Sequence, residues 1–175
     1  MQDEDILSII WRKLLDSAII NPTNALTHGP VDSLVKSDLM SPLIEGLAEE
    51  VMAVGVAVGA TYEWSTATEW RAVCAARFPT CKFSMLQDVE AGRQMEVAPL
   101  VAAVGDVARS LDISTPRLDT VAALIGHYNT NIVGQKIQVV AASQDAARAE
   151  VGGAALQGTT TCCVPHAAGG PVQRM

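Results

Sequence analysis

The chain has 175 residues, of which 49% are hydrophobic and 18% charged, and its formal net charge is −7. This composition supplies a substantial core for one domain and excludes a wholly disordered chain, while the acidic balance favours neither a nucleic-acid nor a membrane partner. Aromatic residues are only 4%, so aliphatic side chains must build the core, and a chain rich in Ala and Leu favours helices.

A first helix is predicted for residues 6–26, where apolar residues recur at helical spacing. Pro22 has no amide donor, so we expect it to end or kink this helix, and residues 27–30 read as a turn. A second helix is predicted for residues 41–59, with Ser41 as the cap and a proline at its first position. Small residues in it would let another helix approach closely: Ala48, Ala53, Gly55 and Ala57.

Shorter helices are predicted farther along the chain. One spans residues 65–76, another begins at Ser84 and breaks at Gly92, and two more span residues 99–110 and 116–128. No alternating strand pattern with hairpin turns occurs before residue 130. The sequence therefore predicts an all-α fold.

The helical pattern fades after about Gln135. Residues 141–151 still suit a helix, but residues 152–175 are mostly Gly, Ala and Thr with little to bury. We therefore expect one helical domain, residues 1–135, followed by a low-complexity, disordered tail, residues 136–175.

Neither a metal site nor a targeting segment is predicted. Adjacent Cys162 and Cys163 lack the C-x-x-C spacing of a structural zinc site, and the three histidines lie far apart. No apolar run reaches the ~18–20 residues of a membrane span, and the acidic N-terminus lacks the basic region of a signal peptide. We therefore expect no metal, no membrane partner and a cytoplasmic location.

The first predicted helix carries a polar stripe. Lys13, Ser17 and Asn21 follow one another at intervals of four residues, so they share one helix face. An ammonium, a hydroxyl and an amide in a row suit a substrate with a carboxylate and a carbonyl. The alternative is a solvated face without a function, and the periodicity does not decide between them.

Ser84 and Glu96 are the second group of candidates. Ser84 is placed either to cap a helix or to bind a ligand. Glu96 follows Gly92 and is expected to begin a new helix, where a carboxylate is also stabilised by the helix dipole. Each residue taken alone is therefore compatible with a purely structural role.

Together these stretches resemble the C-terminal domain of ketopantoate reductases (2-dehydropantoate 2-reductases), over roughly residues 6–125. The matching segments are Trp11-Arg12-Lys13-Leu14-Leu15, Ile20-Asn21-Pro22, Ala25-Leu26, Ser84-Met85-Leu86-Gln87-Asp88-Val89-Glu90-Ala91-Gly92-Arg93, Glu96 and Ser114-Thr115-Pro116. The block that begins at Ser84 is the most specific of these segments. The proline signals are less specific.

The resemblance implies an all-helical domain like the C-terminal domain of 6-phosphogluconate dehydrogenase. It also implies NADPH-dependent reduction of ketopantoate to pantoate, on the route to pantothenate and coenzyme A. By the same resemblance Lys13 protonates the carbonyl oxygen, and Asn21, Ser84 and the Ser17 position bind the substrate. Glu96 organises the lysine and the cofactor side of the site.

The sequence departs from the family at two points. Ser17 stands where the family usually has asparagine, and serine offers one rotatable donor in place of a planar amide, which leaves the identity of the 2-keto acid open. The family's nucleotide-binding half is a Rossmann domain with a G-x-G-x-x-G turn, and this sequence contains no such motif. We expect the chain alone to be inactive.

Two functions follow from these departures. The first is the catalytic, substrate-binding half of a ketopantoate reductase, working with a separate Rossmann-domain chain. The second is a non-catalytic helical remnant that binds another protein or forms a homodimer through apolar surface. The retention of Lys13 and Glu96 together favours the first, because packing does not require the pair.

Overall fold

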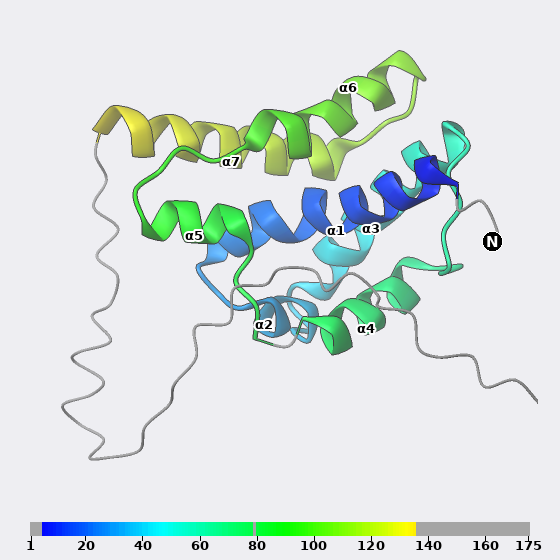
Figure 1. The fold of residues 1–175 in the computed structure, drawn as a ribbon, viewed down its shortest axis with the longest axis horizontal. Helices are drawn as coiled ribbons and strands as arrows, with labels where there is room; N and C mark the ends of the chain where they lie inside the picture. The colour runs from blue at the N-terminus through cyan, green and yellow to red at the C-terminus, as the bar shows by residue number, and fades with distance from the viewer. Residues whose placement is uncertain (1–4, 79, 136–175) are drawn as a thin grey trace, which may run out of the picture.

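The computed structural model describes residues 5–78 and 80–135, and every regular element in these ranges is helical (Figure 1). The prediction of an all-α domain is thereby confirmed. The predicted tail, residues 136–175, lies outside the described residues. The elements are α1 (Ile6–Thr27), α2 (Val31–Val35), α3 (Ser41–Ala57), α4 (Ala67–Arg77), α5 (Ser84–Glu90), the π-helical turn η1 (Ala98–Ala102), α6 (Ala103–Ser110) and α7 (Pro116–Gln135).

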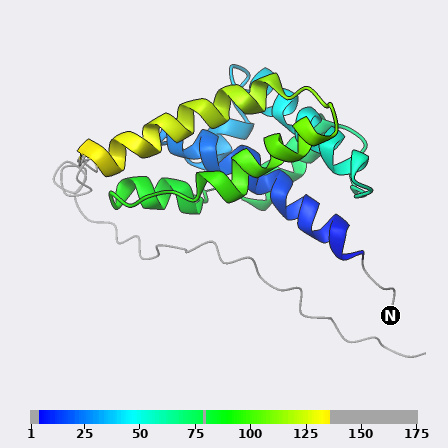
Figure 2. The same cartoon turned by 90° about the horizontal axis from the view of Figure 1, so that it is seen from above.

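Helix α1 is the central element. It packs against α5, α3, η1, α7 and α2, so most of the molecule is built around it (Figures 1 and 2). Its side chains Leu15, Ile19 and Ile20 are completely buried among aliphatic partners. A side chain on α1 is therefore placed by contacts with several elements at once.

Pro22 does not end α1, contrary to one of the two outcomes expected from the sequence. The helix continues to Thr27, and His28 follows in the left-handed conformation with φ of 55°. The turn that contains Pro22 is buried, and the Thr23 hydroxyl donates to the carbonyl of Ile19 at 2.7 Å. Burial of this turn offsets the lost amide donor, whose cost is about 3 kcal/mol in an ordinary helix interior. The turn expected at residues 27–30 is confirmed only in part, because Thr27 is the last residue of α1 and the irregular connection covers residues 28–30.

The cap of α3 and the start of α4 differ from the prediction. Ser41 is not the cap of α3, because Met40 holds that position and makes no side-chain cap hydrogen bond. The chain already turns before Ser41, whose amide donates to the carbonyl of Ser37 at 2.9 Å. Helix α4 is capped by Thr66, whose hydroxyl accepts from the amide of Glu69. The short helix α2 was not predicted, because five residues are too few to show a helical period.

The small residues of α3 permit close approach at one of the predicted positions in particular. A Cβ on Gly55 would lie 1.9 Å from the hydroxyl oxygen of Tyr62 and 3.0 Å from the Trp11 ring. Ala48 is also completely buried in the core, whereas Ala53 and Ala57 are exposed. The sequence thus predicted that small residues of α3 permit close contacts, whereas the tertiary packing determines at which of these residues a close contact is made.

Helix α7 begins on a buried carboxylate. Glu50 of α3 accepts from the amides of Arg117 at 3.0 Å and Leu118 at 2.8 Å, which satisfies free amides at the start of α7. Helix α7 runs to Gln135, farther than the predicted end near residue 128, because its inner face stays packed as far as Ile132. Within the described ranges, no helix has both the length and the apolar character that crossing a membrane requires.

Candidate functional site

Asn21 and Ser84 meet where α1 packs against α5. The side-chain oxygen Oδ1 of buried Asn21 accepts from the Ser84 hydroxyl at 3.2 Å and from the amide of Met85 at 3.3 Å. Both bonds use Oδ1, so they fix the orientation of the carboxamide. The Nδ2 group is left with no hydrogen-bond partner among the described residues, and it remains a donor for a ligand.

Ser84 is not a helix cap, so one of the two roles left open for it is wrong. Phe83 is the N-cap residue of α5, without a side-chain cap bond, and Ser84 lies in the first turn. Its hydroxyl instead donates to Asn21, and the residue is exposed. The contact links two segments that are 63 residues apart.

Asn24 supports this junction and was missed by the sequence reasoning. It is completely buried one turn beyond Asn21, where Oδ1 accepts from the amide of Phe83 at 3.0 Å and Nδ2 donates to the carbonyl of Gly29. It thereby holds the chain just before Ser84 against α1. The sequence does contain a signal for Asn24, because it is a second asparagine three residues after Asn21 inside an apolar segment.

Lys13 and Ser17 lie farther toward the N-terminus on the same face of α1, as the spacing predicted. Lys13 is exposed and Ser17 half-buried, and neither makes a hydrogen bond or ion pair within the described part of the chain. The Lys13 side chain is therefore not held by a carboxylate among the described residues and is open to an anionic ligand.

The carboxylate nearest to Lys13 along α1 is turned away into the core. Asp16 accepts from the indole Nε1 of Trp70 at 2.9 Å, and its other oxygen lies 3.3 Å from Arg77 Nη1. Burial raises the pKa of Asp16 from its ordinary 3.8, while the Trp70 hydrogen bond and the Arg77 charge oppose the rise. Asp16 therefore belongs to the packing of α1 on α4 and does not neutralise Lys13.

Glu96 lies in the link between α5 and η1. It precedes the helical segment, which starts at Val97, so the prediction that Glu96 begins the helix is off by one residue. The side chain is exposed and makes no hydrogen bond or ion pair with the rest of the described chain. The amide and carbonyl of Met95, just before it, are both bonded to Asn129 of α7.

The structure thus brings some of the predicted residues together and leaves others apart. Asn21 and Ser84 are joined by a hydrogen bond, and Lys13 and Ser17 continue the same helix face. Glu96 is bonded to none of them, although η1, which follows it, packs on α1.

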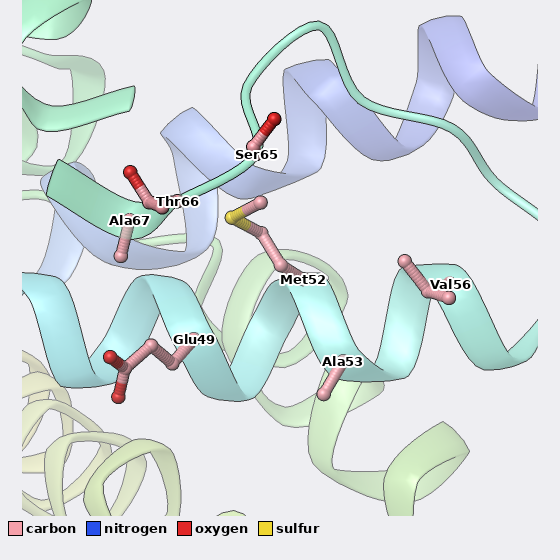
Figure 3. A pocket seen from close by; sticks show the side chains of 7 residues that line it. All are labelled: Glu49, Met52, Ala53, Val56, Ser65, Thr66 and Ala67. Atoms are coloured by element: carbon pink, nitrogen blue, oxygen red, sulfur yellow. The ribbon is translucent and has the colours of Figure 1, made fainter. Parts of the chain in front are cut away.

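A groove of about 570 Å³ lies elsewhere, between α3 and the start of α4 (Figure 3). Figure 3 shows Met52 reaching toward Ser65 and Thr66, and the lining includes none of the five predicted residues. Within the described ranges, no cluster of His, Cys, Asp and Glu is arranged to hold a metal.

The architecture defines the class: an all-helical domain of the kind that forms the C-terminal part of ketopantoate reductases. The family model described as "Ketopantoate reductase PanE/ApbA C terminal" matches residues 5–129. The chain belongs to this family, and the resemblance inferred from the sequence is confirmed.

A curated relative agrees with this assignment, and two solved structures share the fold. A 2-dehydropantoate 2-reductase of Mesorhizobium japonicum is 35% identical over 122 residues, which are 70% of this chain and 37% of the relative. A dimeric ketopantoate reductase from Staphylococcus aureus shares the fold with a TM-score of 0.66 and 24% identity, over 74% of this chain and 45% of that one. A D-mandelate dehydrogenase with NADH and anilino(oxo)acetate has a TM-score of 0.67 at 18% identity, over 75% and 55%. The chain thus spans well under half of the curated relative.

Proposed function

We propose that this chain is the substrate-binding, proton-donating part of an NADPH-dependent 2-dehydropantoate 2-reductase. The observation that carries the proposal is the Asn21–Ser84 junction, which continues along α1 to the unpaired ammonium of Lys13. Family membership supplies the reaction class. In the cell, the product pantoate would enter pantothenate and coenzyme A synthesis in the cytoplasm.

The proposed roles follow from the chemistry of each group. A 2-oxo acid carries a carboxylate and a carbonyl, and Lys13 is the unpaired cation on the polar face of α1. Its ammonium gives a proton from Nζ to the carbonyl oxygen and recovers one from water, and its charge stabilises the developing oxyanion. The Nδ2 group of Asn21 and the hydroxyls of Ser17 and Ser84 hold the polar groups of the substrate.

The cofactor side of the site is only partly represented in this chain. A nicotinamide cofactor, when bound, supplies the hydride that reaches the carbonyl carbon. Glu96 is exposed and has no ion pair within the described ranges, which fits a role in orienting Lys13 and contacting the cofactor. The described residues contain no strand and therefore no strand-to-helix glycine turn for the phosphates. We propose that a Rossmann domain provides that turn.

The proposed position of the Rossmann domain is the outer face of α1. Ile6, Ile9 and Ile10 are exposed there by 72%, 39% and 54%, on the helix face that also carries Lys13. Complete burial of one such side chain is worth about 1.5–3 kcal/mol, so covering three of them favours docking. A domain bound here would lie beside the proton donor.

Reconstitution tests the proposal. The chain is mixed with the nucleotide-binding domain of the Mesorhizobium relative, and NADPH oxidation is followed with ketopantoate. We expect turnover that neither part shows alone and that Lys13→Met removes. Association without turnover would contradict the proposed reaction.

The exposed isoleucines also favour the second candidate, a non-catalytic interaction or dimerisation module. This function predicts self-association through α1, which Ile10→Ser should weaken while leaving the helical content unchanged. Light scattering over a wide range of protein concentration measures whether the chain self-associates. A monomer at all concentrations would exclude the homodimer.

A further inference from the structure

Asn129 of α7 makes two hydrogen bonds to a single residue in the link between α5 and η1. Its Oδ1 accepts from the amide of Met95 at 2.8 Å, and its Nδ2 donates to the carbonyl of Met95 at 3.2 Å. One carboxamide thus satisfies both main-chain groups of Met95, as a neighbouring strand would. The arrangement fixes the position and the orientation of the peptide groups on both sides of Met95.

The Met95 side chain adds a second anchor, because it is 3% exposed and belongs to the hydrophobic core. Both flanking residues, Gln94 and Glu96, are exposed. Met95 is therefore held by its side chain and by its main chain, and Glu96 is the first free side chain after this anchor. The place from which the Glu96 carboxylate projects depends on the Asn129 bonds.

The same end of α7 is fastened to α1. Tyr128, next to Asn129, has its hydroxyl 3.0 Å from Nε2 of His28, the residue that ends α1. Helix α7 thus contacts the end of the helix that carries Lys13 and Asn21, and it also holds the link that carries Glu96. These bonds set the two parts of the proposed site relative to each other.

We propose that Asn129 is a positioning residue, which holds Glu96 in place for the reaction by fixing the main chain of Met95. The inference rests on the proposed function, because it assigns Asn129 a role through Glu96. It requires a group that both donates and accepts, whereas an ionised Asp at this position would accept from the Met95 amide and leave its carbonyl without a donor.

The chain offers matched variants. Asn129→Ala removes both bonds, and Asn129→Asp keeps an acceptor for the Met95 amide but loses the donor to its carbonyl. Thr130→Ala is the control, since the exposed Thr130 hydroxyl donates to the carbonyl of Gly126, within α7 itself. Circular dichroism and thermal unfolding establish that each variant folds.

The first experiment needs only this chain. Amide exchange and nitrogen relaxation are measured by NMR for Met95 and Glu96. In Asn129→Ala we expect Met95 exchange to rise about tenfold and the Glu96 amide to become more mobile, with Asn129→Asp intermediate and Thr130→Ala unchanged. Unchanged exchange and mobility in a folded Asn129→Ala variant would overturn the inference.

The second experiment is a double-mutant cycle in the reconstituted reductase. Asn129→Ala should lower kcat about tenfold while KM for the 2-oxo acid stays within about twofold, because the Asn21–Ser84 junction is intact. The double variant with Glu96→Ala should be no slower than Glu96→Ala alone, whereas a general structural role would give additive losses. Additivity would overturn the inference.

The two experiments separate this inference from the proposed function. If the reconstituted wild type shows no turnover, or if Glu96→Ala turns over normally, the proposed function or the role of Glu96 is wrong. The NMR measurement still decides, independently of turnover, whether Asn129 holds Glu96 in place.

Discussion

The two halves of α1 have similar side chains and opposite surroundings. Toward the N-terminus, Ile6 and Ile10 are exposed beside Lys13, whereas toward the C-terminus Ile19 and Ile20 are completely buried. Helix α1 as a whole packs on α5, α3 and α7, and the asparagines of its later half are fixed by hydrogen bonds to neighbouring segments. The later half is thus mostly buried, whereas the earlier half, although its Trp11 is buried, also offers an apolar surface beside the exposed Lys13.

The largest expected effect tests the exposed half. Lys13→Met should lower reductase turnover of the reconstituted enzyme by about 10²–10⁴-fold, the range typical of a general acid. The midpoint of urea unfolding should barely move, because Lys13 is exposed and has no ion pair among the described residues. Lys36→Met, at another exposed lysine, is the control. Full activity of Lys13→Met would show that Lys13 is not the proton donor.

The next effect compares an isoleucine from each half. Ile19→Ala should lower the free energy of unfolding by about 2–5 kcal/mol, because it leaves a cavity in a closed core. Ile10→Ala should change it by less than about 0.5 kcal/mol, because that side chain is half exposed. Equal losses in the two variants, measured by urea denaturation, would contradict the division of α1 into these regions.

A pH-dependent effect tests the buried side of α1. Because burial raises the pKa of Asp16 above 3.8, the folded state holds its proton more tightly than the unfolded state. The contribution of Asp16 to stability is fully present below 3.8 and is lost as the pH rises through the folded-state pKa. Asp16→Asn carries no charge and keeps an acceptor for Trp70 Nε1, so its stability relative to the wild type should increase as the pH rises through that window.

Urea unfolding at several pH values checks this expectation. Asp38→Asn is the control, because Asp38 is exposed and unpaired within the described chain. A stability difference between Asp16→Asn and the wild type that is the same at every pH would contradict the prediction.

The smallest effect tests the junction between the buried end of α1 and α5. Ser84→Ala removes the hydroxyl that donates to Asn21, but the Met85 amide still bonds to the same oxygen. Stability should fall by less than about 1 kcal/mol, and KM for ketopantoate should rise by up to about tenfold. Ser110→Ala, which removes a hydroxyl bonded within α6, should leave KM unchanged. An unaltered KM in Ser84→Ala would remove Ser84 from the substrate site.

Sequence reasoning went furthest where local periodicity governs the structure. The face shared by Lys13, Ser17 and Asn21 follows from helix geometry alone, and the all-α class follows from the absence of strand patterns. Sequence reasoning was less successful where contacts with other segments determine the local structure. Pro22 stays inside a helix because the turn around it is buried, and Ser84 bonds to Asn21 because α5 packs there.

By itself, then, the sequence determined the helical class, the family, and the residues that share a face of α1, since each depends on residue order and short-range spacing. Only the tertiary structure decided which half of α1 is buried, which oxygen orients Asn21, and how Asn24 and Asn129 hold the segments before Ser84 and Glu96. These features join residues about 30 to 60 positions apart, and contacts at that separation exist only once the helices pack together.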